Sequence, residues 1–444
     1  MYKKYILPVL LLSAVLVLSI TCAGRTSKPD IKPALPELPV NMKQCQEIVE
    51  RISDRKFKSD VRAKVQSAAE FRNFVRADLD KSLGGNAKWE QMALSKLGLL
   101  PEGYDLRQGL ENLLVSQAGA YYDPPSKTMY FVKLNMPKTM LETTVIHELT
   151  HALQDQHYDL EKLIKTADNN DRETAVRYLM EGEASYVMNI AQMEQMRMTF
   201  TPDSPVLEMA LNRAGNLGRR PLMEMTMSQA EEYKETAPDI YDALTAIKDA
   251  PDYLFWILTA PYIRGAYSIH TIVATDGKSR NWKAIDNVYA NPPVSTEQMI
   301  HPAKLAEPRD NPEPVAPPKL GEEWTMLTEN TLGELGFWIL FSNYTETRAN
   351  EASEGWDGDK YFLLQHNKTK DIVLYLSTVW DSDNDSYESF NAYQKVLAGR
   401  YPSAQIQKEN GSGKITYTLS DSSRIVLTMK NNAWTAEELP SGTK

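Results

Sequence analysis

The five residues His-Glu-Leu-Thr-His at positions 147–151 constrain the fold and chemistry of this chain more than any other stretch of its sequence. They lie in an apolar-faced segment that predicts a helix over residues 138–155. Because an α-helix has about 3.6 residues per turn, His147 and His151 project from one face and can share one metal ion. Glu148 lies about 100° further round, where it can reach a water molecule without being a ligand. The alternative, two core histidines and a surface glutamate, is disfavoured by the five-residue pattern.

Two histidines leave a tetrahedral zinc ion short of a protein ligand, so this interpretation requires a third residue from elsewhere. Residues 168–171 form a helix-capping cluster, and the long helix predicted from Arg172 onward contains the sequence Glu-Gly-Glu-Ala at 181–184. A glycine in mid-helix costs about 1 kcal/mol relative to alanine. Gly182 therefore predicts that another backbone or a ligand comes close to this second helix.

The two motifs, His-Glu-x-x-His and Glu-Gly-x-Ala, resemble those of the gluzincin metallopeptidases. The resemblance implies that Glu181 is the third ligand of one zinc ion, together with His147 and His151. Glu148 would act as the general base of peptide-bond hydrolysis. Glu183 is the rival ligand, but it points about 200° away from Glu181 on the same helix, which favours a solvated side chain or a partner of a ligand.

Two other classes of protein remain open at this point. Two histidines and one carboxylate also describe a non-haem iron site, in which open positions bind oxygen; Glu148 favours hydrolysis, because such a site needs no base there. The chain is alternatively a non-catalytic envelope protein with a structural metal and a C-terminal binding domain. A closed structural site requires a fourth protein ligand, and none is evident in the sequence.

Peptide hydrolysis also requires a donor that stabilises the oxyanion. Tyr262 and His270, at the two ends of one segment, are candidates, and His301 within residues 291–302 is a third. A lone histidine specifies no geometry, so a surface or packing role is favoured for His301. The same holds for His157, which leaves the ligand face of its helix.

Residues 117–134 differ from their helical surroundings, because two β-rich runs flank the turn-forming residues 123–127. They predict a hairpin beside the active-site helix. The gluzincin resemblance implies that residues 128–134 form an edge strand that binds the substrate backbone as an added strand. An ordinary packed hairpin is the alternative.

The N-terminus predicts export from the cytoplasm. Two lysines precede an almost unbroken apolar run over residues 5–20, which is typical of a secretory signal ending near Cys22. The context of Cys22 resembles a bacterial lipoprotein signal, in which this cysteine is lipidated and attaches the protein to a membrane. Plain secretion is the alternative, since Leu18 lies one position too early. Residues 23–40 are proline-rich and predict a tether.

A second proline-rich segment, residues 306–319, predicts a linker between two folded parts. The first part, residues 41–305, is expected to be a mainly helical, zincin-like metallopeptidase domain with a small sheet, in keeping with the gluzincin resemblance. Residues 251–275 are apolar but interrupted, and predict a buried helix pair rather than a membrane span. Residues 320–444 predict a small accessory α+β domain, with strands at 360–365, 371–379, 414–419 and 424–429 and a helix at 385–397.

Composition excludes some partners. Forty-nine Lys and Arg residues against 59 Asp and Glu residues give a net charge of -10, and no basic stripe is present, so nucleic acid is not an expected partner. The expected substrate is a peptide or protein. Only two cysteines occur, so the hydrophobic core rather than a disulfide framework must hold the fold.

Overall fold

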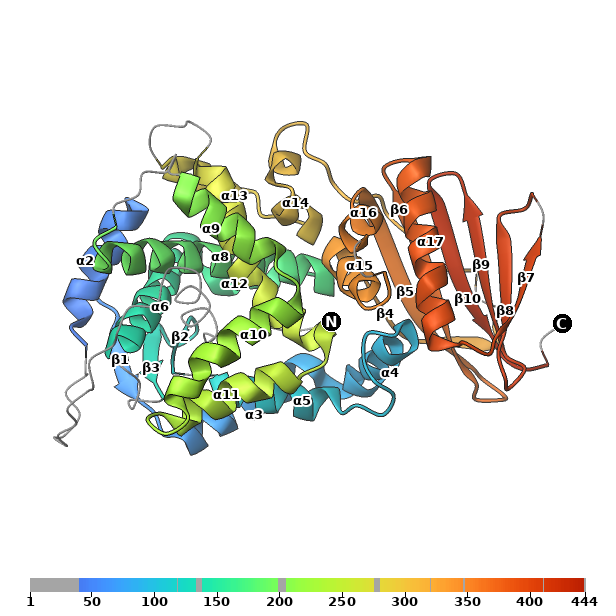
Figure 1. Cartoon of the computed structure of the whole chain (residues 1–444), viewed down its shortest axis with the longest axis horizontal. Helices are drawn as coiled ribbons and strands as arrows, with labels where there is room; N and C mark the ends of the chain where they lie inside the picture. The colour runs from blue at the N-terminus through green and yellow to red at the C-terminus, as the bar shows by residue number, and fades with distance from the viewer. Residues whose placement is uncertain are drawn as a thin grey trace.

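The computed structural model describes residues 40–442 except 118, 133–137, 199–204, 275–279, 320, 346–347 and 410. The predicted signal, Cys22 and nearly all of the predicted tether therefore lie outside the described residues. Helices dominate one end of the elongated molecule, and a large β-sheet forms the other (Figure 1). The described part combines α and β structure, with two separate sheets.

The helical part carries most of the elements that the sequence predicts. The helix predicted over residues 138–155 extends to Tyr158, and the long helix predicted from Arg172 begins at Asn170. Its helices are α2 (Met42–Ser53), α3 (Ala68–Leu83), α4 (Ala87–Leu97), α5 (Leu106–Gln117), α6 (Lys138–Tyr158), α7 (Leu160–Lys165), α8 (Asn170–Gln195), α9 (Pro205–Asn216), α10 (Arg219–Ala230), α11 (Pro238–Asp249), α12 (Asp252–Val273), α13 (Trp282–Ala290) and α14 (Thr296–Ile300), with short 3-10 turns η1 (Gly84–Asn86), η2 (Glu231–Tyr233) and η3 (Pro302–Leu305).

Helices α8 and α12 cross at two glycines. A Cβ added at Gly182 would lie 2.6 Å from the carbonyl carbon of Gly265, and one added at Gly265 would lie 3.0 Å from the Cα of Gly182. Any side chain at either position would therefore push the helices apart. The close backbone approach predicted from Gly182 is confirmed.

The prediction of a buried helix pair over residues 251–275 is wrong, because α12 is one continuous helix with Pro261 inside it. Its residues are largely buried, as predicted. Within the described residues, no helix combines the length and the apolar character that crossing a membrane would require.

The small sheet lies beside α6 and consists of β1 (Arg62–Val65), β2 (Ala120–Asp123) and β3 (Thr128–Phe131). The predicted hairpin is confirmed as the antiparallel pair β2 and β3, and β1 adds to β3 in parallel. The order β1-β3-β2 makes β3 the central strand. The prediction of an edge strand at 128–134 is therefore wrong for the described residues of that segment, since both backbone edges of β3 are paired and cannot bind a substrate strand.

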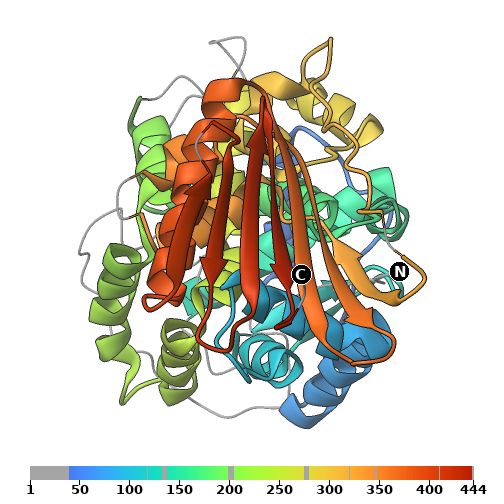
Figure 2. The same ribbon diagram turned by 90° about the vertical axis from the view of Figure 1, so that its right-hand side faces the viewer.

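The second sheet has seven strands in the order β4-β5-β6-β10-β9-β8-β7, and all neighbouring strands are antiparallel. Its helices cover one face and leave the other uncovered in Figure 2. The predicted strands and helix are present, and β4, β7 and β10 were not predicted. The elements are β4 (Trp324–Asn330), β5 (Trp356–His366), β6 (Ile372–Trp380), β7 (Gln405–Glu409), β8 (Lys414–Thr418), β9 (Arg424–Lys430), β10 (Ala433–Leu439), α15 (Gly333–Ser342), α16 (Ala349–Ser353) and α17 (Asp383–Arg400).

Helix α15 joins the two ends of the molecule. Phe337 packs edge-on against Trp380 of the sheet, with ring centroids 5.5 Å apart, and Trp338 packs edge-on against Trp256 of α12 at 4.9 Å. One hydrophobic core therefore runs through both parts. Residues 306–319 have no regular secondary structure, as predicted for a linker, but the parts they connect are packed together.

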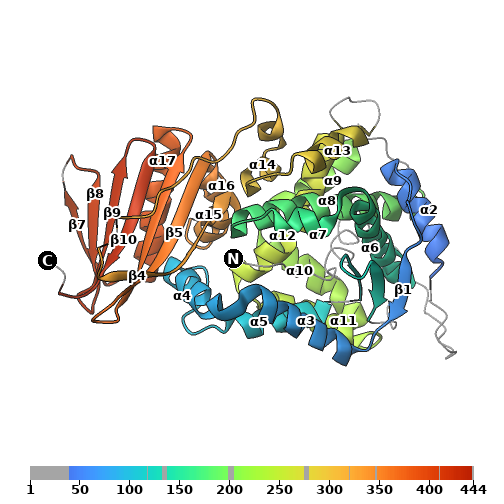
Figure 3. The same ribbon diagram turned by 180° about the vertical axis from the view of Figure 1, so that it is seen from behind.

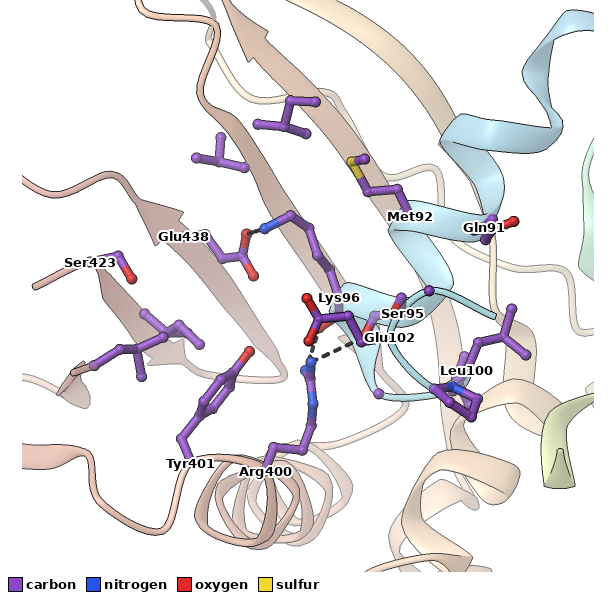
Figure 4. A pocket seen from close by; sticks show the side chains of 18 of the residues that line it. Gln91, Met92, Ser95, Lys96, Leu100, Glu102, Arg400, Tyr401, Ser423 and Glu438 are labelled. Atoms are coloured by element: carbon purple, nitrogen blue, oxygen red, sulfur yellow. Dashed lines mark hydrogen bonds and ion pairs between the residues drawn. The ribbon is translucent and has the colours of Figure 1, made fainter. Parts of the chain in front are cut away.

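A groove of about 1160 Å³ with a mixed polar and apolar lining lies where α4 meets the end of the large sheet (Figure 4). Arg400 at the end of α17 donates to the carbonyl oxygens of Ser95 and Lys96, which satisfies the C-terminal end of α4. Lys96 forms an ion pair with Glu438 at 2.7 Å. The groove is therefore bordered by polar contacts that fasten the sheet to the helical part.

Candidate metal centre

Helices α6 and α8 bring together the three residues predicted to be ligands, here called the α6–α8 trio: His147, His151 and Glu181. Seen from behind in Figure 3, α6 and α8 lie side by side within the helical part. The Nε2 atoms of the two histidines are 3.1 Å apart, and each is 3.1 Å from Oε2 of Glu181. Their relative exposures are 0%, 7% and 6%, so water is nearly excluded from the side chains.

These distances fit a single metal ion. With bonds of about 2.0 to 2.2 Å to a tetrahedral ion, ligand atoms lie roughly 3.3 Å apart. Three atoms that carry lone pairs, buried and facing one another, would repel unless a cation or protons lay between them. Two imidazole nitrogens and a carboxylate oxygen suit a divalent transition metal. Within the described residues no fourth His, Cys or acidic side chain joins the trio, so its ligand set stays open on one side.

Gln154 fixes how His151 presents its lone pair. The Nε2 group of Gln154 donates to the carbonyl of Met180 at 3.0 Å and to Oε2 of Glu183 at 2.9 Å, so its Oε1 must face His151. That oxygen lies 2.9 Å from Nδ1 of His151 and can only accept a hydrogen bond. The neutral imidazole therefore carries its proton on Nδ1 and directs the lone pair of Nε2 at the trio.

Glu183 supports the centre without being a ligand. It is completely buried, accepts from Tyr289 at 2.7 Å as well as from Gln154, and forms an ion pair with Arg55. Of the two alternatives predicted for Glu183, a solvated side chain is wrong because it is buried, and its contact with Gln154, which also contacts His151, agrees with a partner of a ligand. The supporting role of Gln154 could have been predicted from the sequence, because Gln154 lies about one helical turn after His151. Arg55 and Tyr289 are distant in sequence, and no motif indicated their contact with Glu183.

The charges within the trio and its burial shift the pKa values of Glu181 and His151 in opposite directions. Burial would raise the pKa of Glu181, but the two imidazoles outweigh it and hold the pKa well below its usual range. Burial lowers the pKa of His147 to about 4. For His151 burial acts in the same direction, but the charge of Glu181 raises its pKa to about 9. Without a metal ion, these shifts leave His147 neutral and favour an imidazolium at His151 beside an ionised Glu181.

Glu148 lies beside the trio with one carboxylate oxygen engaged. Its Oε2 accepts from the backbone N–H of Tyr122 in β2 at 2.6 Å, while its Oε1 is buried without a hydrogen-bond partner among the described residues. The hydroxyl of Tyr122 donates to Asp155 two turns further along α6 at 2.7 Å, which holds β2 against that helix. Burial raises the pKa of Glu148 to about 8. This geometry leaves Oε1 able to accept a proton.

The three candidate donors lie in different places. Tyr262 belongs to the centre: its ring stacks on His147 with centroids 5.7 Å apart and planes at 18°. Burial raises the pKa of Tyr262 well above its usual value, and the charges of Glu181 and Glu148 raise it further, so the hydroxyl keeps its proton. His270 lies two turns further along α12 and contacts Tyr186. His301 pairs with Glu334 of α15 at 2.9 Å, which agrees with the packing role favoured for it.

The comparison with known protein families gives a match in the C-terminal part of the chain, which carries the large sheet and helices α15 to α17. A family model described as a domain of unknown function (DUF8575) matches residues 323–439. No curated protein and no solved structure matches the chain. The matched range begins just before β4 and ends with β10, so it contains none of the residues of the metal centre.

A second group of acidic side chains resembles a metal site in spacing only. It is called the Lys304 trio and comprises Glu297, Asp310 and Asp381. The ammonium group of Lys304 lies 2.6, 2.8 and 2.9 Å from their carboxylate oxygens. A cation of the chain itself therefore occupies the position that a metal ion would take, and the contact ties α14 and the 306–319 segment to the large sheet.

Proposed function

We propose that this protein is a zinc-dependent peptidase that hydrolyses peptide bonds. The observation that carries the proposal is the juxtaposition of the α6–α8 trio with a neighbouring glutamate that has one unengaged, buried oxygen. Among the described residues Glu148 lies outside the trio and forms no ion pair, so the arrangement favours a general base over a purely structural carboxylate. The open side of the trio supports a catalytic rather than a structural metal.

A zinc ion held by the trio would supply Lewis-acid chemistry, polarising the scissile carbonyl and lowering the pKa of a water molecule towards about 7. Oε1 of Glu148 would accept a proton from the attacking water and pass it to the leaving amine. The backbone N–H of Tyr122 keeps Oε2 in place, so the carboxylate cannot rotate away. Tyr262, whose hydroxyl stays protonated, is the donor best placed to stabilise the oxyanion.

The decisive experiment compares Glu148→Gln with the parent on an unstructured protein substrate. We expect both proteins to bind one equivalent of zinc, and the variant to cleave at least about 100-fold more slowly, because a positioned base contributes that much or more. Glu142→Gln is a matched control, because Glu142 lies on the same helix, outside the trio, and pairs with Lys138 at 3.7 Å. Equal cleavage by Glu148→Gln would contradict the proposal.

Metal analysis of the same preparations separates the alternatives. Iron in place of zinc would favour oxygen chemistry over hydrolysis. One equivalent of zinc without cleavage of any substrate tried would favour a structural metal in a binding protein.

The proposed enzyme acts outside the cytoplasm, secreted or attached through a lipidated Cys22. The apolar run at 5–20 and the proline-rich segment that follows support this proposal. Mass spectrometry of the N-terminal peptide tests it, since a diacylated Cys22 and an unmodified new N-terminus differ by several hundred daltons in mass, roughly two acyl chains of the kind that anchor proteins.

A further inference from the structure

Arg55 brings a positive charge from the N-terminal part of the chain close to the metal centre. It follows helix α2, which packs against α6 and α8 at the helical end of the molecule (Figure 1). Its side chain is 8% exposed, and its guanidinium forms an ion pair with the completely buried Glu183. Among the described residues no other lysine or arginine pairs with Glu183. Arg55 therefore supplies the charge that compensates the burial of this carboxylate.

Two aromatic rings and a hydroxyl hold the guanidinium of Arg55 in place. Its Nη1 group donates to the hydroxyl of Tyr158 at 2.7 Å, and its central carbon lies 5.5 and 5.4 Å from the ring centroids of Tyr158 and Trp282. Tyr289, which donates to Glu183, stacks on Tyr158 with ring centroids 3.9 Å apart. A planar guanidinium can make the ion pair, the hydrogen bond and the ring contacts at once, whereas the ammonium of a lysine cannot.

A chain of contacts runs from Arg55 to a ligand of the α6–α8 trio. Oε2 of Glu183 accepts from Nε2 of Gln154 at 2.9 Å, and Oε1 of Gln154 lies 2.9 Å from Nδ1 of His151. Without its counter-charge the Glu183 carboxylate would no longer be held in place, and the amide of Gln154 would be freer to turn by 180°. The turned amide would present an N–H group to Nδ1 of His151, so that the imidazole would carry its proton on Nε2, the atom that faces the trio.

We infer that Arg55 is a positioning residue of the metal centre: through Glu183 and Gln154 it fixes the nitrogen of His151 that offers its lone pair to the metal. The inference rests on the proposed function, because it requires the trio to hold zinc. Arg55 lies in the segment between α2 and β1. Docking of this N-terminal segment onto α6 and α8 is therefore a condition for tight metal binding.

The segment that carries Arg55 is also fastened to α6 by contacts that do not involve the guanidinium. The backbone N–H groups of Lys58 and Ser59 donate to Oε1 of Gln156 at 2.6 and 3.1 Å, and Nε2 of Gln156 donates to the carbonyl of Ser59 at 3.0 Å. These contacts are expected to keep the segment in place when Arg55 is replaced. The effect of a substitution on the metal centre can therefore be separated from a loss of the fold.

The test measures zinc affinity in Arg55→Met, Arg55→Lys and the parent by competition with a chromophoric chelator. We expect Arg55→Met to weaken zinc binding by about 10 to 100-fold, as for other residues that hold a ligand in place. Arg55→Lys keeps the counter-charge but loses the planar fork, so we expect a smaller loss of about three to tenfold. Arg51→Met is the matched control, because it removes another arginine–glutamate pair between α2 and α8, with Glu194 at 2.5 Å, outside the trio.

A double variant distinguishes positioning from a general loss of stability. If Arg55 acts through Gln154, the double variant Arg55→Met and Gln154→Leu should bind zinc about as tightly as Gln154→Leu alone, because residues in one hydrogen-bond network do not contribute additively. Losses that multiply, or an unchanged zinc affinity in both Arg55 variants, would overturn the inference and leave the proposed peptidase standing. The expected coupling in a protein that cleaves no peptide would support the inference and count against the peptidase. A parent that binds no zinc would overturn both.

Discussion

The α6–α8 trio and the Lys304 trio each place three ligand atoms within 4.8 Å of one another, yet only one of the two groups suits a metal ion. The first is buried, contains two imidazole nitrogens, and has one of its ligands, His151, oriented by a hydrogen bond with Gln154. The second is built of carboxylates alone, is partly exposed and encloses the ammonium of Lys304. Spacing therefore does not identify a metal site; the donor atoms, their orientation and the absence of an internal cation do.

The largest expected effect is on metal binding when one ligand is neutralised. Glu181→Gln removes the charge and leaves an amide that coordinates zinc poorly, so we expect zinc affinity to fall by more than about 100-fold, beyond the loss caused by changing a supporting residue. Glu194→Gln is the matched control, because Glu194 is a half-buried glutamate near the end of the same helix and is paired with Arg51. Asp310→Asn in the Lys304 trio should leave zinc content unchanged. Competition with a chromophoric chelator measures the zinc affinity of all three variants. Equal zinc affinity in Glu181→Gln and the parent would show that Glu181 is not a ligand.

The second prediction concerns pH. In the metal-free protein the pKa of His151 is about 9, so at pH 7 its Nε2 carries a proton that a metal ion must displace. Each unit of pH below about 8 should therefore lower zinc affinity about tenfold from this group alone. His147, with a pKa of about 4, stays neutral and adds nothing in this range. Calorimetry in buffers of different ionisation enthalpy should detect at least one proton released on binding at pH 7, and none would contradict the assignment.

The third prediction tests orientation. Gln154→Leu removes the acceptor that fixes Nδ1 of His151 and leaves the oxygen of Glu183 without one of its donors. We expect zinc affinity to fall by about 10 to 100-fold, as for other residues that hold a ligand in place. Gln108→Leu on the exposed side of α5 is the control for the loss of a glutamine. A Gln154→Glu variant, which restores an acceptor, should recover part of the zinc affinity. An unchanged zinc affinity in Gln154→Leu would show that His151 needs no such partner.

The sequence predicted the local parts of the centre well and the distant parts poorly. The four-residue spacing predicted that His147 and His151 share one face, and the glycine in mid-helix predicted a close approach at Gly182. Both signals can be read within a single helix. The position of β3 was predicted wrongly because strand order depends on β1, which lies more than fifty residues earlier. Arg55 was missed for the same reason: its contact with the centre is made by tertiary packing alone.

The smallest effect is expected when the Lys304 trio loses its ammonium group, and it tests how this trio differs from the α6–α8 trio. Lys304→Met removes the ammonium from three carboxylates, of which Glu297 is almost fully buried. Burial already raises the pKa of Glu297 to about 8, although Lys304 opposes this. We expect a loss of about 1 to 3 kcal/mol in the free energy of unfolding, the usual cost of leaving a buried polar group without its partner, measured by denaturant titration at pH 7. Zinc content and peptide cleavage should not change, because Lys304 contacts no residue of the α6–α8 trio.

Since Ca²⁺ prefers clusters of carboxylate oxygens, millimolar Ca²⁺ should raise the melting temperature of the Lys304→Met variant and leave that of the parent unchanged. Stabilisation of both proteins by Ca²⁺ would mean that the ammonium does not hold the place of a cation.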